Sequence, residues 1–194
     1  MKQSFCWWVG SNLGLWILFV FVPTSFAQEI TSGNSSGIYL TKEDFTNSSI
    51  SFAHEIDSRN CLQIDLNSNI ILVRNAIATK FRYGECFGYH YKGDRYRAYS
   101  VGWSWFTYIG YYKIEDERTL IIYSKRGHHK SPNAIFYYYS RLADSPIFGL
   151  NIRNLKKEFP DNPELVGKLK KHRSSLYKRR GNHLVVNNII NCLQ

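Results

Sequence analysis

From about Ile70 to Ser140, the chain is a succession of short runs rich in β-branched and aromatic residues, separated by Gly, Asp and charged turns. Such runs are typical of β-strands. The main predicted strands are residues 86–92, 95–101, 107–114, 119–124 and 134–140. Gly93-Asp94 and the charged segment 115–118 supply two of the turns, the first because Gly readily adopts positive φ. Connections this short join neighbouring strands, so the region predicts an antiparallel meander.

The hydrophobic period changes after the strands. Asn151 is a helix cap for a segment that runs through Glu158, and Asn162 followed by Pro163 is a second helix start. The apolar stripe of the second helix is predicted to contain Leu165, Val166, Leu169 and His172. A strand-like run at 183–190 closes the chain. We therefore predict an α+β fold: an antiparallel β-meander sheet of about six to eight strands with two short C-terminal helices packed on it.

The amino terminus has the order of a secretory signal. Lys2 precedes an apolar stretch that is continuous over residues 13–22, and Pro23 ends that stretch. Small residues Ser25 and Ala27 then stand at the −3 and −1 positions of a cleavage site. A membrane anchor is the rival interpretation, but a span requires about 20 predominantly apolar residues. We predict a signal peptide at 1–27 and an exported protein, periplasmic or secreted, without a transmembrane segment after cleavage.

The remainder is predicted to be a flexible leader at 28–37 and a single β-rich domain with C-terminal helices at 38–194. A hydrophobic share of 44% is enough for a folded core. The three cysteines of this part are Cys61, Cys86 and Cys192, and either one disulfide with one buried thiol or three buried thiols is compatible with the sequence. Their spacing matches no zinc pattern, and we predict neither a metal nor a cofactor.

Two segments resemble a known group of proteins. They are residues 37–45, Gly-Ile-Tyr-Leu-Thr-Lys-Glu-Asp-Phe, and the stretch from Asp144-Ser145-Pro146-Ile147 through residues 154–162. Both are similar to secreted proteins of Bacteroidota bacteria for which no activity is assigned, and the aromatic strands between them fall in a similar order. The shared residues are packing, turn and capping residues. The resemblance therefore implies an envelope or secreted location and this architecture, and it transfers no functional residues.

Basic residues are concentrated in the carboxy-terminal quarter. Of the net charge of +10, residues 151–194 contribute most, with ten Lys and Arg against three Asp and Glu. The predicted electrostatic surface consists of Lys168, Lys170, Lys171, Arg173, Lys178, Arg179 and Arg180. Such a cluster suits anionic envelope lipids or acidic polysaccharides as well as nucleic acid, and export argues against nucleic acid.

Aromatic residues are dense in the strand region. Because adjacent residues of a strand point to opposite faces, consecutive tyrosines place some rings outward. Outward rings offer flat surfaces for sugars or protein partners, unless loops cover the second face too. The predicted binding residues are Trp103, Trp105, Tyr108, Tyr111, Tyr137 and Tyr139.

Catalytic signals are weak. No G-x-S-x-G motif occurs, and His128-His129 lies in a basic loop that would repel a cation. The acidic segment Glu115-Asp116-Glu117 is interpreted as an exposed hairpin turn without the rigid placement that paired-carboxylate chemistry requires. No catalytic residue is assigned. The leading hypothesis is a non-enzymatic binding module for a glycan or an envelope protein, and the alternative is a small secreted hydrolase whose site is assembled in the fold.

Overall fold

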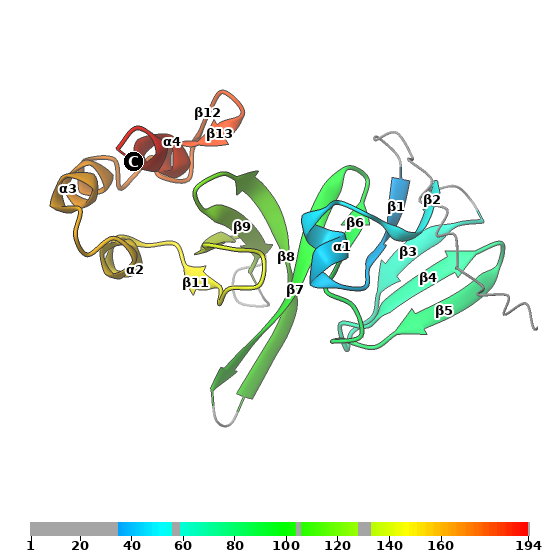
Figure 1. The fold of residues 1–194 in the computed structure, drawn as a ribbon. Helices are drawn as coiled ribbons and strands as arrows, with labels where there is room; N and C mark the ends of the chain where they lie inside the picture. Colours follow the sequence, from blue (N-terminus) through cyan, green and yellow to red (C-terminus); the bar gives the residue numbers. More distant parts are fainter. Residues whose placement is uncertain (1–34, 56–58, 104–105, 128–132, 194) are drawn as a thin grey trace, which may run out of the picture.

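The computed structural model describes residues 35–55, 59–103, 106–127 and 133–193 (Figure 1). The fold is α+β, as predicted. Its main sheet contains β1 (Ser35–Tyr39), β2 (Ser51–Glu55), β6 (Gly88–Tyr91), β7 (Asp94–Trp103), β8 (Phe106–Glu117), β9 (Ile121–Arg126), β10 (Ile135–Ser140) and β11 (Phe148–Gly149). These eight strands are antiparallel and lie in the order β11-β10-β9-β8-β7-β6-β1-β2.

The predicted meander is confirmed, because β6 to β11 are neighbours in chain order. The hairpin between β6 and β7 is confirmed as well, with its turn one residue earlier than predicted. Tyr91 pairs with Asp94, so the loop is Lys92-Gly93. Both loop residues have positive φ, +50° and +85°, which matches the twist of the flanking strands.

The structure adds a second sheet to the predicted one. Residues before the meander form a separate three-stranded antiparallel sheet of β3 (Cys61–Ile64), β4 (Ile70–Arg74) and β5 (Ile77–Phe81). The predicted flexible leader extends too far, because residues 35–37 belong to β1, where Ser35 and Ser36 are buried between β2 and β6. The signal peptide and leader residues 28–34 lie outside the described residues.

One face of the main sheet is covered by two different layers. The three-stranded sheet packs over the β1–β6–β7 end, where Ile38, Ile70 and Tyr89 share a core cluster. The C-terminal elements pack over the β9–β10 end, where Ile122 and Tyr139 meet helix residues. Figure 1 shows these two layers at the two ends of the main sheet, with β7 and β8 between them. Helix α1 (Lys42–Thr46) places Phe45 against Phe87 and Tyr39.

The C-terminal elements are α2 (Ile152–Glu158), α3 (Pro163–Lys171), the strands β12 (Arg179–Arg180) and β13 (His183–Leu184), and α4 (Val185–Asn191). The caps are confirmed: the side chains of Asn151 and Asn162 accept hydrogen bonds from the amides of Asn154 and Leu165. His172 is an exposed C-cap of α3 and is not part of its apolar stripe.

The predicted last strand at 183–190 is wrong, and the described C-terminal region contains three helices instead of two. After the short β13, residues 185–191 form α4. Val186, Asn187 and Ile190 are its buried residues, a spacing that lies on one side of a helix. Tertiary packing of this face therefore overrides the strand preference of β-branched residues. Within the described ranges, no helix is both long and apolar enough to cross a membrane.

Candidate functional site

A groove of about 340 Å³ lies at the outer edge of β10. We call it the β10 groove, and it is lined by Ile135, Phe136, Tyr137, Tyr138, Gly149, Leu150, Asn151 and Tyr177. Ile135 and Phe136 are 54% and 50% exposed, and Tyr177 is 38% exposed. Large apolar side chains of this kind are usually covered in a folded domain when they gather in one place. Their grouping marks this edge as a candidate binding surface.

The groove exists because β11 covers only part of β10. The two residues of β11 pair with Tyr138 and Tyr139, and the amide of Leu150 then donates to the carbonyl of Tyr137 (2.9 Å). At Asn151 the chain leaves the sheet, because the Asn151 side chain caps α2. Among the described residues, no strand pairs with Ile135 or Phe136 on this side.

Backbone groups of Ile135 point to this open edge. The amide of Gly127 donates to the carbonyl of Ala134 (2.7 Å), which directs the backbone groups of residues 134, 136 and 138 towards β9. In an antiparallel ladder the residues between them direct their N–H and C=O groups the other way, as the Leu150–Tyr137 bond confirms. Ile135 therefore presents a donor and an acceptor at the rim of the β10 groove.

The wall of the groove opposite β10 is held by several contacts. Tyr177 donates its hydroxyl to the carbonyl of Leu150 (2.8 Å), and its ring stacks on Tyr137 with centroids 4.9 Å apart and an interplanar angle of 16°. The side chain of Asn154 donates to the carbonyl of Gly149 (2.8 Å). These bonds fix the wall before any ligand binds.

The predicted aromatic residues do not form one surface. Tyr137 lines the groove, but Tyr139 is buried and its hydroxyl donates to the Glu158 carboxylate (3.3 Å). Burial, with the nearby Glu158 charge, raises the pKa of Tyr139. Tyr111 packs beside the cluster under the three-stranded sheet, and its hydroxyl donates to the carbonyl of Ser68 (2.9 Å). Tyr139 is buried beside helix α2, so its ring does not offer the outward flat surface that the sequence prediction assumed.

The side chains of the other three predicted aromatic residues are not described. Trp103 and Tyr108 stand in β7 and β8, but only their strand positions are described, and Trp105 lies outside the described residues. The sequence prediction missed Ile135, Leu150 and Tyr177. Ile135 and Phe136 belong to the predicted strand at 134–140, but the sequence does not show that this end of the strand lacks a second partner. Nothing local marks Tyr177, because the turn after α3 brings it to the groove.

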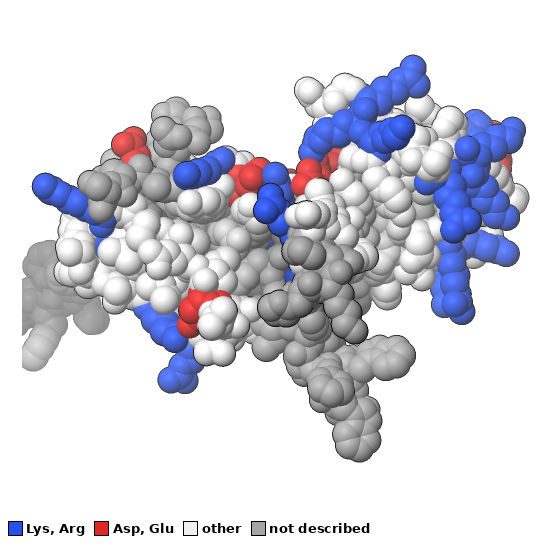
Figure 2. Space-filling view, turned by 180° about the vertical axis from the view of Figure 1, so that it is seen from behind, with Lys and Arg blue, Asp and Glu red and all other residues white. Residues whose placement is uncertain are grey.

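The residues of the predicted basic surface lie at the C-terminal end. Figure 2 shows Lys and Arg side chains gathered at the end of the molecule where the C-terminal helices lie. Its seven predicted members are all exposed. Arg179 is nevertheless paired, because its Nη2 atom donates to the carboxylate of Glu115 (2.7 Å) and to the Glu115 carbonyl (2.9 Å). Lys168 pairs with Glu164 one turn away (3.0 Å).

The acidic segment is not an exposed turn. Glu115-Asp116-Glu117 continues β8, and a bulge after Ile114 shifts the register so that Asp116 pairs with Ile122. The shift directs Asp116 towards the C-terminal elements, and its side chain is 1% exposed. It accepts hydrogen bonds from the amide of Leu184 (2.8 Å) and joins Nδ1 of His183 (2.9 Å). The prediction of a solvated turn is therefore wrong.

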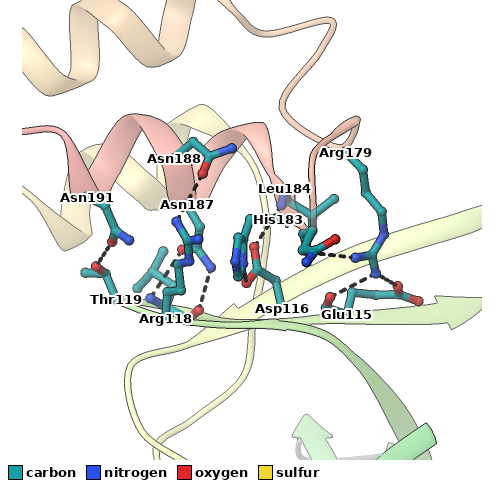
Figure 3. Close-up of polar contacts among 12 residues, drawn as sticks. Glu115, Asp116, Arg118, Thr119, Arg179, His183, Leu184, Asn187, Asn188 and Asn191 are labelled. Carbon is teal, nitrogen blue, oxygen red and sulfur yellow. Dashed lines mark hydrogen bonds and ion pairs between the residues drawn. The ribbon is translucent and has the colours of Figure 1, made fainter. Parts of the chain in front are cut away.

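We call this set of contacts the C-terminal junction (Figure 3). Next to Asp116, the buried Asn187 side chain donates to the carbonyl of Leu120 (2.9 Å) and accepts from its amide (3.3 Å). Arg118 donates to Asn188, and Thr119 donates to Asn191. These bonds satisfy the backbone of the β8–β9 turn and attach α4 to it.

A buried carboxylate that orients a half-exposed histidine is also part of many hydrolytic sites. In the described part of the chain, however, no hydrogen bond connects His183 with a hydroxyl or a thiol; Ser124 donates to Glu115 instead (2.7 Å). No group of three or more metal-ligating side chains occurs among the described residues. The bonds of the junction attach the C-terminal elements to β8 and to the turn that follows it.

Two basic side chains, Arg97 and Lys125, lie inside the main sheet beside aromatic rings. Arg97 is 3% exposed; its guanidinium donates to the Tyr123 hydroxyl (3.1 Å) and the Ser145 carbonyl (2.8 Å). Burial lowers the pKa of Lys125, whose ammonium lies 4.6 Å from the Tyr112 ring centroid, to about 8.

The three described cysteines are all free, so neither a disulfide nor three buried thiols is found: Cys86 is buried, Cys61 half-buried and Cys192 exposed.

Comparison with known proteins adds no relative. No protein-family model, no curated protein and no solved structure matches this chain.

Proposed function

We propose that this protein is an exported, non-enzymatic binding module that recognises an extended segment of a protein partner at the β10 groove. One observation carries the proposal: the groove is lined by four consecutive residues of one edge strand, residues 135–138. Alternate side chains of a strand point to opposite faces, so a groove that contacts all four runs along the strand edge. An extended peptide added to that edge is a common mode of recognition.

The available contacts suit a peptide. The N–H and C=O groups of Ile135 would each form one backbone hydrogen bond with the added strand, contributing about 1 kcal/mol apiece. The exposed halves of Ile135 and Phe136 would be covered, at roughly 1 kcal/mol for each side chain. Association costs at least several kcal/mol, so the partner segment must also contact the opposite wall at Leu150 and Tyr177.

A glycan suits the same groove less well. Sugar recognition by aromatic side chains uses the flat face of a ring. The rings of Tyr137 and Tyr177 stack on each other, so each has one face already covered. Ile135, Phe136 and Leu150 of the lining offer no side-chain hydrogen bonds to hydroxyl groups. The side chain of Asn151 already donates to the Gly149 carbonyl and accepts from the Asn154 amide. A protein segment with apolar side chains is the better match.

The proposal is tested by selecting displayed random 12-residue peptides on the purified full-length protein. We expect enriched peptides with apolar residues at alternate positions. Their binding is then measured to Phe136→Ser, which removes an apolar contact, and to Ile135→Pro. Proline at 135 removes the outward N–H while leaving the bonds to β9 intact, because those come from residues 134 and 136. Both variants should bind the selected peptides with at least tenfold lower affinity than the wild type does.

The matched control is Ile77→Ser, an exposed apolar residue of β5 in the other sheet. It should bind the selected peptides like the wild type. A glycan array is probed in parallel with the same proteins. Two results would reject a peptide-binding groove. One is that the selected peptides bind all three variants as tightly as they bind the wild type. The other is that the protein binds only glycans and that Phe136→Ser weakens this binding.

A further inference from the structure

A second hollow lies at the C-terminal end, apart from the β10 groove. It encloses about 400 Å³ between α3, β12 and α4 and is lined by Lys168, His172, Ser175, Arg180, Val185, Asn188, Ile189 and Cys192. We call it the α3–α4 pocket. Its volume is within the range of sites for small molecules.

The floor of the pocket is one side of α4. Val185, Asn188, Ile189 and Cys192 follow one another at intervals of three, one and three residues, which is a single helical stripe. The other side of α4 buries Val186 and Ile190 in the main core. Ile189 also packs in part against this core, so the apolar surface that α4 leaves to the pocket consists of Val185 and the exposed part of Ile189.

Two cations lie at the rim of the pocket. They are Lys168 near the end of α3 and Arg180 of β12, and His172 lies one turn after Lys168. Among the described residues that line the pocket, none carries a carboxylate. Glu164 pairs with Lys168, but its side chain is 70% exposed, and a surface pair of this kind is weak enough to be exchanged for a ligand.

We propose that the α3–α4 pocket binds a small amphiphile with one anionic group, of the class of medium-chain carboxylates. The apolar chain lies on Val185 and Ile189, and the carboxylate lies at Lys168 and Arg180. An apolar floor under a cationic rim complements a molecule with these two parts. A strongly hydrated polyanion would leave the floor uncovered, and a purely apolar molecule would leave the rim unused. The proposal does not depend on the function of the β10 groove.

Cys192 provides a direct reporter. It is an exposed free thiol in the pocket lining, whereas Cys61 is half-buried and Cys86 is buried. The rate at which N-ethylmaleimide alkylates Cys192 is measured on the full-length protein by mass spectrometry of the peptide that contains it. Decanoate, kept below the concentration at which it forms micelles, is the probe. At ten times its dissociation constant it should slow the alkylation about tenfold, because about one pocket in ten remains empty.

Two pairs of substitutions separate the pocket from the general positive charge. Lys168→Gln with Arg180→Gln removes both rim charges and should abolish protection by decanoate. Lys170→Gln with Arg173→Gln removes two exposed charges that do not line the pocket and should leave protection unchanged. Ile189→Trp fills the floor and should also abolish protection while the rim charges remain.

Four results would overturn the proposal. Equal protection by decanol would show that the charge plays no part. If both double variants lose protection by decanoate equally, the protection depends on the overall positive charge and not on the rim of the pocket. Protection by vesicles of anionic phosphatidylglycerol but not by decanoate would show that this end docks on a membrane surface. Absence of protection by any of these compounds would reject the pocket as a site for this class of ligand.

Discussion

The C-terminal junction allows a quantitative test of how the last helix is held. The perturbation is Asp116→Ala, which removes a buried carboxylate that bonds the Leu184 amide and His183. A second variant, Asp116→Asn, keeps one acceptor oxygen for the Leu184 amide. Its amide group can donate to Nδ1 of His183 when the ring carries its proton on Nε2.

The expected magnitude follows from burial. Removing the carboxylate leaves the buried Leu184 amide without its acceptor, which costs about 1–3 kcal/mol. The His183 ring is 33% exposed, so water replaces part of its bond, and about 1 kcal/mol is lost there. Asp116→Ala should therefore lower the free energy of unfolding by about 2–4 kcal/mol, and Asp116→Asn by about 1 kcal/mol.

The assay is urea unfolding of the full-length protein, followed by circular dichroism and by hydrogen exchange. The control is Arg179→Ala, which removes an ion pair from a side chain that is 49% exposed and should cost under 1 kcal/mol. In Asp116→Ala, exchange of the α4 amides should accelerate more than exchange in β4 of the three-stranded sheet. A loss no larger than that of Arg179→Ala, or unchanged exchange in α4, would refute the attachment role of Asp116.

Three further predictions concern charge, capping and processing. Because burial lowers the pKa of Lys125 to about 8, the unfolded chain binds its proton more tightly; stability should rise as pH increases from about 8 to 10.5. Lys125→Met should remove this rise and increase the free energy of unfolding at pH 7 by about 1–2 kcal/mol, a figure reduced to allow for the partial exposure of Lys125. If the difference in free energy of unfolding between the two proteins stays constant from pH 7 to 10.5, the lowered pKa of Lys125 is contradicted. Asn162→Ala removes the bond to the Leu165 amide and should cost about 1 kcal/mol in urea unfolding, whereas an unchanged midpoint would mean that the cap contributes nothing. Protein recovered from the medium or periplasm of an expressing bacterium should begin at Gln28 by amino-terminal sequencing, and a chain that keeps Met1 would contradict signal cleavage.

Local chemistry determined much of the fold. The Lys92-Gly93 hairpin forms because its two residues take the positive φ that a two-residue turn requires, and the sequence places Gly there. Asn151 and Asn162 start helices because their side chains satisfy free amides of the first turn. The meander follows from strands joined by short connections. All of these interactions span few residues, so a pattern in the sequence predicts them.

Contacts between distant segments decided the rest. Residues 185–191 form a helix because the core beside β9 and β10 accepts Val186 and Ile190, although their β-branched side chains favour strands. Asp116 is buried because a bulge directs it to Leu184, 68 residues further along the chain. Likewise, the β10 groove needs Tyr177 beside Tyr137, and the α3–α4 pocket needs Arg180 beside Lys168. Single-sequence patterns report spacing along the chain, whereas both candidate sites depend on which segments the tertiary fold places together.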